Sequence, residues 1–271
     1  CDVKFLDSVS YILEPEHNTK FNRFSLGFVQ REEGNLLDKA TFGGHQSLRD
    51  REKSYHAENQ SIHCGFVGGG GGHPTAGFDL DENDRRYMST CRVAVSSCIF
   101  GNSDFLRRPT SKLISEYSKI NVCFVMFLDE QSLGKLAAEG IIPDDNGRKI
   151  GLWKIVVVKN LPYDDLRKSG KVPKFLSHRL FPSSRYSIWL DSKLKLNADP
   201  MLIIEYFLWR NGSEYAISDH YARRCVWEEV LQNKRLNKYN SSAIDEQFLF
   251  YQSDGLTKYE SSSGNDVPLP S

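Results

Sequence analysis

An acid and a base stand two residues apart at Asp191 and Lys193, directly after the alternating apolar stretch 186–190. Successive side chains of a strand point to opposite faces, so these two project the same way if the extended backbone continues. An acid can hold a divalent metal ion, and a lysine can neutralise phosphate as a point charge. The pair indicates either a surface ion pair at a strand exit or the floor of a site that binds a charged ligand.

Two more groups of charged residues are expected at the same place. The first lies on a predicted helix before this strand, and its members are Lys174, His178 and Arg179. The second follows the next predicted strand, and its members are Asp219, His220, Arg223 and Arg224. Together these groups suit an anionic ligand, most simply a diphosphate. The alternative is an ordinary charged rim, because strand exits are solvated.

The elements that would position these residues alternate along the chain. Apolar runs predict strands at 91–100, 122–128, 153–161, 186–191 and 214–220. Capping residues and helical spacing predict helices at 79–90, 129–140, 171–182, 199–212, 226–238 and 243–255. This order predicts an α/β fold with a mostly parallel, Rossmann-like sheet and helices on both faces. Ligands bind such sheets at the carboxyl ends of the strands, where Phe100, Gly101 and Asp129 also lie.

The first part of the chain has a different character. Residues 1–63 are polar without a sustained period, and five glycines follow at 68–72. We expect an irregular N-terminal extension at 1–63, a catalytic domain at 64–260 and a disordered tail at 261–271. Because the chain begins at Cys1, we interpret it as a piece of a longer protein.

Bulk composition excludes some partners. Lysine plus arginine and aspartate plus glutamate both number 35, so the formal charge is zero and no overall basic field would gather nucleic acid. No stretch approaches the roughly 18 apolar residues that a membrane span needs, so we expect any membrane anchor to lie outside this segment.

Six cysteines and seven histidines suggest further chemistry. Cys98 and Cys123 lie in apolar runs and are predicted to be buried thiols, whereas Cys64, Cys91 and Cys225 are candidates for disulfides. Four histidines lie close together between residues 45 and 73, before the predicted sheet: His45, His56, His63 and His73. They raise the alternative of a zinc-dependent hydrolase, although HExxH is missing and their spacing fits no helical face.

From about Cys64 to Tyr259 the chain resembles a plant family once labelled a domain of unknown function, which includes turgor-regulation-defect and mucilage-related proteins. The segments that carry the resemblance are RVAVSSCIFG, VCFVMFLDE, GLWKIVVVKNLPYDDLRKSGKVPKFLSHRLFP, YSIWLDSKLKLNADP, FLWR, YAISDHYARR and AIDEQ. The family is similar to glycosyltransferases of the GT-A kind. The resemblance implies lumenal domains of Golgi type II membrane proteins, among them galacturonosyltransferases that extend pectic rhamnogalacturonan from a UDP-sugar.

The resemblance also implies roles for individual residues. In GT-A enzymes an Asp-x-Asp at this strand end holds Mn²⁺ against the nucleotide diphosphate, and here it is Asp191-Ser192-Lys193. Asp191 remains a candidate metal or ribose ligand, while Lys193 can take part of the charge neutralisation, so Mn²⁺ dependence stays open. Asp245 and Glu246 open a predicted helix where such folds often place an acid near the acceptor, and the alternative is a helix-dipole charge. The candidate catalytic residues are Asp191, His220, Asp245 and Glu246.

The function expected from sequence is sugar transfer from a UDP-sugar to a pectic cell-wall polysaccharide. Two alternatives stay open: a metal-dependent amide or lipid hydrolase of the ceramidase type, and a catalytically silent carbohydrate-binding relative.

Overall fold

The computed structural model describes residues 3–15, 25–28, 59–62, 77–141, 144, 148–218, 220, 222–253 and 255–258. The chain divides into two compact units, and each is described by itself. The described part of the first unit comprises residues 3–15 and those between 77 and 213. The described part of the second comprises two short N-terminal strands and residues between 214 and 258. The predicted boundaries after 63 and 260 stay predictions.

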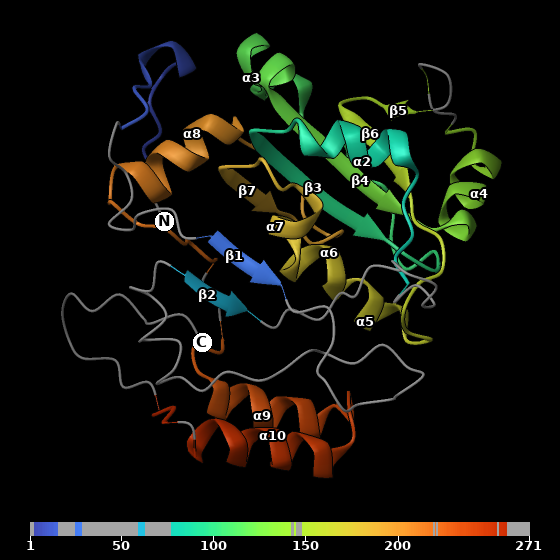
Figure 1. The fold of residues 1–271 in the computed structure, drawn as a ribbon, viewed down its shortest axis with the longest axis vertical. Coiled ribbons are helices and arrows are strands. Elements are labelled where there is room, and N and C mark those ends of the chain that lie inside the picture. Colours follow the sequence, from blue (N-terminus) through green and yellow to red (C-terminus); the bar gives the residue numbers. More distant parts are fainter. Residues whose placement is uncertain are drawn as a thin grey trace. The chain divides into compact units, whose positions relative to one another are not determined.

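A five-stranded sheet forms the centre of the first unit (Figure 1). Its strand order is β5-β6-β4-β3-β7, and every pair is parallel except β5 with β6. The strands are β3 (Val93–Ile99), β4 (Val122–Leu128), β5 (Lys149–Ile150), β6 (Trp153–Val157) and β7 (Tyr186–Trp189). The predicted mostly parallel α/β fold is confirmed. From β3 the chain proceeds outward through β4 to β6 and then returns to place β7 on the other side of β3.

Alternate side chains of the central strands enter two separate apolar cores. Val95 and Phe124 belong to the core on one face, and Ala94 and Val125 belong to the core on the other. This arrangement follows from the twofold side-chain alternation of a strand, and it explains why β4 is apolar throughout.

Helices cover both faces, as predicted. The first core takes side chains from α4 (Glu130–Ala138), α8 (Pro200–Ile204) and the π-helical turn η3 (Glu205–Trp209), which continues α8. Another helix, α3 (Glu116–Asn121), ends directly at the start of β4. The second takes side chains from α2 (Glu82–Ser89), α5 (Leu166–Ser169), α6 (Lys171–Phe175) and α7 (Ser177–Leu180). The helix expected at 171–182 is thus two short helices, with α5 directly before them.

The N-terminal segment 3–15 packs on the first unit through specific contacts. It contains the 3₁₀ turn η1 (Val9–Tyr11), and Phe5 makes an edge-to-face contact with Tyr206 at 5.5 Å between ring centroids. Glu14 forms ion pairs with Arg92 at 2.6 Å and Arg185 at 3.0 Å. These contacts attach the segment to η3 and to the amino ends of two strands.

A disulfide joins Cys91 to Cys123, with their Cα atoms 5.8 Å apart. The prediction that Cys123 is a buried thiol is therefore wrong. The pairing of β3 with β4 places Cys123 opposite Ala94, near the point where Cys91 precedes β3. Cys98 does keep its thiol, and so does Cys225, whereas Cys64 lies outside the described residues.

The described part of the second unit contains β1 (Ser25–Phe28), β2 (Asn59–Ile62), α9 (Val226–Arg235) and α10 (Ser241–Ser253). β1 and β2 pair in parallel, and Trp227 of α9 packs edge to face on Phe248 of α10 at 5.0 Å. The strand predicted at 214–220 is wrong for its described residues, which are irregular. Its apolar side chains Tyr215 and Ile217 are 61% and 73% exposed, so the alternation faces no core.

Candidate functional site

The carboxyl ends of β3 and β7 form the topological switch point of the sheet. These strands are neighbours, with Ser96 opposite Trp189, and the strand order reverses between them, since β4 follows on one side of β3 and β7 returns to the other. Open α/β sheets bind ligands outside the carboxyl ends of the strands at such a point. The segment Asp191–Lys193 follows β7 at this point, so the predicted location of the site agrees with the topology.

Asp191 is held by two donors on one oxygen. Its Oδ1 accepts hydrogen bonds from Trp189 Nε1 at 2.8 Å and from Lys174 Nζ at 3.0 Å. Desolvation alone would raise the pKa of Asp191, but the bonds from Trp189 and Lys174 and the charges of Lys174 and Lys171 outweigh it and lower the pKa below its ordinary value. Asp191 therefore stays ionised at neutral pH.

The expectation that Asp191 and Lys193 project the same way depended on a continued strand, and the strand does not continue. Asp191 O accepts a hydrogen bond from Leu194 N at 2.7 Å, which closes a turn with Ser192 and Lys193 at its centre. The base that pairs with Asp191 is thus Lys174 of α6. In the part of the chain that the structure describes, exposed Lys193 has no ion-pair partner.

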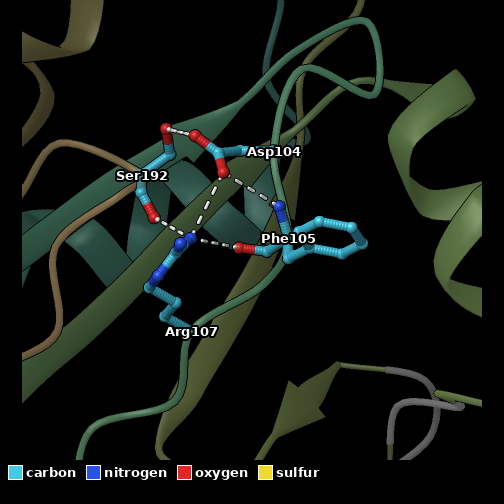
Figure 2. Close-up of polar contacts among 4 residues, drawn as sticks. All are labelled: Asp104, Phe105, Arg107 and Ser192. Carbon is cyan, nitrogen blue, oxygen red and sulfur yellow. Dashed lines mark hydrogen bonds and ion pairs between the residues drawn. The ribbon is translucent and has the colours of Figure 1, made fainter.

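Sequence reasoning missed a polar ring that fixes this turn. Figure 2 shows Asp104, Arg107 and Ser192 joined by hydrogen bonds, with Asp104 and Arg107 in the loop after β3. The signal that could have found Asp104 and Arg107 is their position just after the predicted strand 91–100, at the same sheet edge as Asp191.

Three predicted binding residues shape the sheet edge. Asp129 caps α4 by accepting a hydrogen bond from Ser132 N at 2.9 Å, and its other oxygen accepts one from Gly101 N at 2.8 Å. Gly101 has φ +64°, which strains a residue that carries a side chain, and an added Cβ would lie 2.1 Å from Leu166 Cδ1, which would have to move. Phe100 is buried beside Phe78. These contacts tie the ends of β3 and β4 together, and direct ligand contacts from these three residues stay a prediction.

His178 and Arg179 lie on α7, after the helix that carries Lys174. Desolvation of the imidazole and then the neighbouring Arg179 charge lower the pKa of His178. The ring is therefore neutral at neutral pH and presents a hydrogen-bonding group rather than a charge.

The remaining predicted residues belong to the second unit. His220 Nδ1 accepts hydrogen bonds from the amides of Ala222 and Arg223 at 3.1 and 3.0 Å. Arg223 forms an ion pair with Glu229, Asp245 forms one with Lys234, and Glu246 is exposed on α10. Asp219 lies outside the described residues. Convergence of this group with Asp191 stays a prediction.

The strand exit does not fit a resident divalent cation. Such an ion needs several oxygen ligands, but Lys193 replaces the second acid and Lys174 already pairs with Asp191. Across the described ranges, no cluster of three or more histidine, cysteine, aspartate or glutamate side chains could hold a metal. The histidines that raised the zinc alternative, His45, His56, His63 and His73, lie outside those ranges.

Comparison with known proteins identifies the family of the chain. A family described as "TOD1/MUCI70, glycosyltransferase-like domain" matches residues 26–271. The chain is 46% identical over 220 residues to "Probable hexosyltransferase MUCI70" of Arabidopsis thaliana, covering 80% of this chain and 37% of that protein. It is 31% identical over 238 residues to "Alkaline ceramidase TOD1" of the same plant, covering 85% of this chain and 48% of that protein.

The chain thus spans less than half the length of either relative. No solved structure matches it. None of the helices among the described residues is long and apolar enough to cross a membrane.

Proposed function

Because the chain belongs to the TOD1/MUCI70, glycosyltransferase-like domain family, we propose that it transfers a hexosyl or uronosyl group from a UDP-sugar to a pectic cell-wall polysaccharide. One structural observation carries the proposal. An exposed lysine without an ion-pair partner among the described residues, Lys193, stands in a turn at the switch point, beside the ionised Asp191. The 46% identity to a protein named a probable hexosyltransferase supports the same reaction class.

In this proposal Lys193 binds the diphosphate of the donor. Its ammonium group neutralises charge on the phosphate oxygens, and it stabilises the UDP leaving group as negative charge develops on it. Lys174 contributes a second cation 3.0 Å from Asp191. Among the described residues, both hydrogen bonds to the Asp191 carboxylate are made to Oδ1. Its Oδ2 can therefore accept a hydrogen bond from a hydroxyl of the UDP-sugar.

Mn²⁺ has no step in this scheme, because the two lysines stand where a metal site would need acids. We propose that transfer continues in the presence of a chelator. The test is donor turnover measured with EDTA and with added Mn²⁺. A strict requirement for Mn²⁺ would overturn this part of the proposal.

The acceptor and the compartment are also proposals. We propose that the chain works in the Golgi lumen as part of a longer membrane-anchored protein. The Cys91–Cys123 disulfide supports this location, since disulfides persist in oxidising compartments and are rare in the cytosol.

The test of the function is UDP binding and donor use with a matched lysine pair. UDP at 100 times its dissociation constant should stabilise the fold by about 2.7 kcal/mol. Lys193→Ala should weaken UDP binding about tenfold, whereas Lys119→Ala, which removes an i,i+3 partner of Glu116 on α3, should not. No thermal shift of the wild type at millimolar UDP would contradict the proposal.

A second candidate, amide hydrolysis of a ceramide, comes from the name of the 31% identical relative. The two functions separate in a direct assay of the same protein. Release of fatty acid from ceramide, lost on replacing His56, His63 and His73 together and accompanied by stoichiometric zinc, would favour the hydrolase. Transferase activity that survives this triple replacement would exclude it.

A further inference from the structure

A closed ring of hydrogen bonds joins the loop after β3 to the turn after β7 (Figure 2). Arg107 Nη1 donates to Asp104 Oδ1 at 3.2 Å, to Phe105 O at 3.4 Å and to Ser192 O at 3.2 Å. Ser192 Oγ donates to Asp104 Oδ2 at 2.8 Å. Both the carbonyl and the hydroxyl of Ser192 are therefore bound to the β3 loop.

Asp104 is the centre of this ring and is well shielded from solvent. Its side chain is 10% exposed, and its carboxylate also accepts a hydrogen bond from Phe105 N at 3.2 Å. Desolvation would raise the pKa of Asp104, but the hydrogen bonds from Ser192, Arg107 and Phe105 outweigh it and lower the pKa. The ring is thus held by a charged acceptor, whose hydrogen bonds are stronger than those of a neutral one.

The ring is attached to the core of the protein through Arg107. The carbonyl oxygen of Arg107 accepts a hydrogen bond from Trp153 Nε1 at 2.8 Å. Trp153 is 2% exposed in β6 and packs edge to face on Phe124 of β4. A shift of the Arg107 backbone would break this bond, so the buried Trp153 side chain anchors the β3 loop at Arg107.

Ser192 lies between the two residues that matter for the proposed donor site. It is bonded covalently to Asp191 and Lys193, and all three belong to the turn closed by the Leu194 amide. Asp191 and Lys193 are themselves exposed. An exposed turn without support would lose conformational freedom on binding a ligand, and that loss weakens affinity.

We infer that Asp104 and Arg107 are positioning residues, which hold the 191–194 turn so that Asp191 and Lys193 face a nucleoside diphosphate in a preorganised geometry. The inference rests on the proposed function. It also gives a role to the middle residue of the Asp191-Ser192-Lys193 sequence, whose hydroxyl donates a hydrogen bond to Asp104.

A purely structural ring would affect stability alone, and a matched ion pair in the same unit separates the two roles. Asp84 of α2 pairs with Lys154 of β6 at 3.4 Å, and their side chains are 13% and 11% exposed. This pair lies between α2 and the face of the sheet, whereas the Asp104 ring lies at the strand ends. Asp84→Asn therefore removes a comparably buried charge away from the turn.

The experiment compares Asp104→Asn and Ser192→Ala with Asp84→Asn in the full chain. UDP affinity is measured by calorimetry, and the position of Asp191 is followed by the NMR resonance of the Trp189 indole, whose N–H donates to Asp191. We expect Asp104→Asn to weaken UDP binding about tenfold, to raise the donor KM more than it lowers kcat, and to shift the Trp189 resonance. Asp84→Asn should change none of these, even where it lowers the melting temperature as much.

Ser192→Ala removes only the hydroxyl and keeps the test decisive if Asp104→Asn does not fold. Wild-type UDP affinity retained in both ring variants, with an unmoved Trp189 resonance, would overturn the inference. A wild type that fails to bind UDP would instead refute the proposed function. The Trp189 resonance would then still decide whether the ring positions the turn.

Discussion

The amino ends of strands β3 and β7, here called the amino edge, and their carboxyl ends, the carboxyl edge, carry similar charged groups. The groups differ in how far protein contacts satisfy them. At the amino edge of β3 and β7, Glu14 accepts from Arg92, Arg185 and the hydroxyl of Tyr186. At the carboxyl edge of the same strands, Asp191 has one oxygen bound by protein donors, and Lys193 is exposed without an ion-pair partner in the described residues. The first cluster is satisfied by the protein, whereas the second leaves hydrogen-bonding capacity for a ligand.

This difference teaches that charge density alone does not identify a site. The amino edge also carries the Cys91–Cys123 disulfide, so covalent and ionic contacts converge on the strand starts. We therefore expect changes at the amino edge to reduce stability and changes at the carboxyl edge to reduce activity.

The largest effect should come from the amino edge. Cys91→Ala with Cys123→Ala removes a crosslink between residues 32 positions apart, which by chain entropy costs about 3–4 kcal/mol of the free energy of unfolding. Denaturant unfolding of the double variant and of the wild type measures this. The dissociation constant for UDP, measured on folded protein, should stay unchanged. A loss of UDP affinity without a loss of stability would reverse the comparison.

The carboxyl edge should show the opposite pattern. Asp191→Asn keeps the shape of the side chain and removes its charge, so turnover of the donor should fall about 10²-fold. The free energy of unfolding should change by only about 0–1 kcal/mol, because the pair with Lys174 is partly exposed. Steady-state kinetics and a melting curve test both parts. A folded Asp191→Asn protein with near-normal turnover would make this edge an ordinary solvated rim.

A smaller effect should follow from the partner of the two arginines. Glu14→Gln leaves Arg92 and Arg185 without their shared carboxylate and should lower stability by about 1 kcal/mol. For a chain of this size that is a fall of a few degrees in melting temperature. Donor turnover at a temperature where both proteins are folded should be the same. Reduced turnover in Glu14→Gln would show that the amino edge is coupled to the site.

The smallest effect concerns pH. The pKa of Asp191 is lowered in the folded protein, so its contribution to stability is present above its unfolded pKa of about 3.9 and is lost as pH falls through the lower folded pKa. The melting-temperature difference between wild type and Asp191→Asn should thus be constant near neutral pH. It should shrink only below about pH 4. If the melting-temperature difference between the two proteins disappeared between pH 5 and 7, the titration of a group other than Asp191 would control it.

Much of the fold could be predicted from local pattern. The apolar run at 122–128 forms strand β4, the first part of the strand predicted at 153–161 forms β6, and Asp129 and Pro200 begin α4 and α8 as expected. The strand predicted at 214–220 is wrong for its described residues, whose alternating side chains Tyr215 and Ile217 are exposed. Apolar alternation along the sequence indicates which side chains could be buried on one face of a strand. Only the packed fold supplies the neighbouring elements that bury them.

The sequence by itself determined the type of sheet and the place of the candidate site at a strand exit, since alternation and capping depend on neighbours in the chain. Only the tertiary structure decided which groups meet. It paired Asp191 with Lys174, 17 residues away, and left Lys193 exposed in a turn. It also bound Ser192 to Asp104, 88 residues earlier in the chain. Such contacts depend on strand order and loop geometry, which spacing along the sequence does not encode.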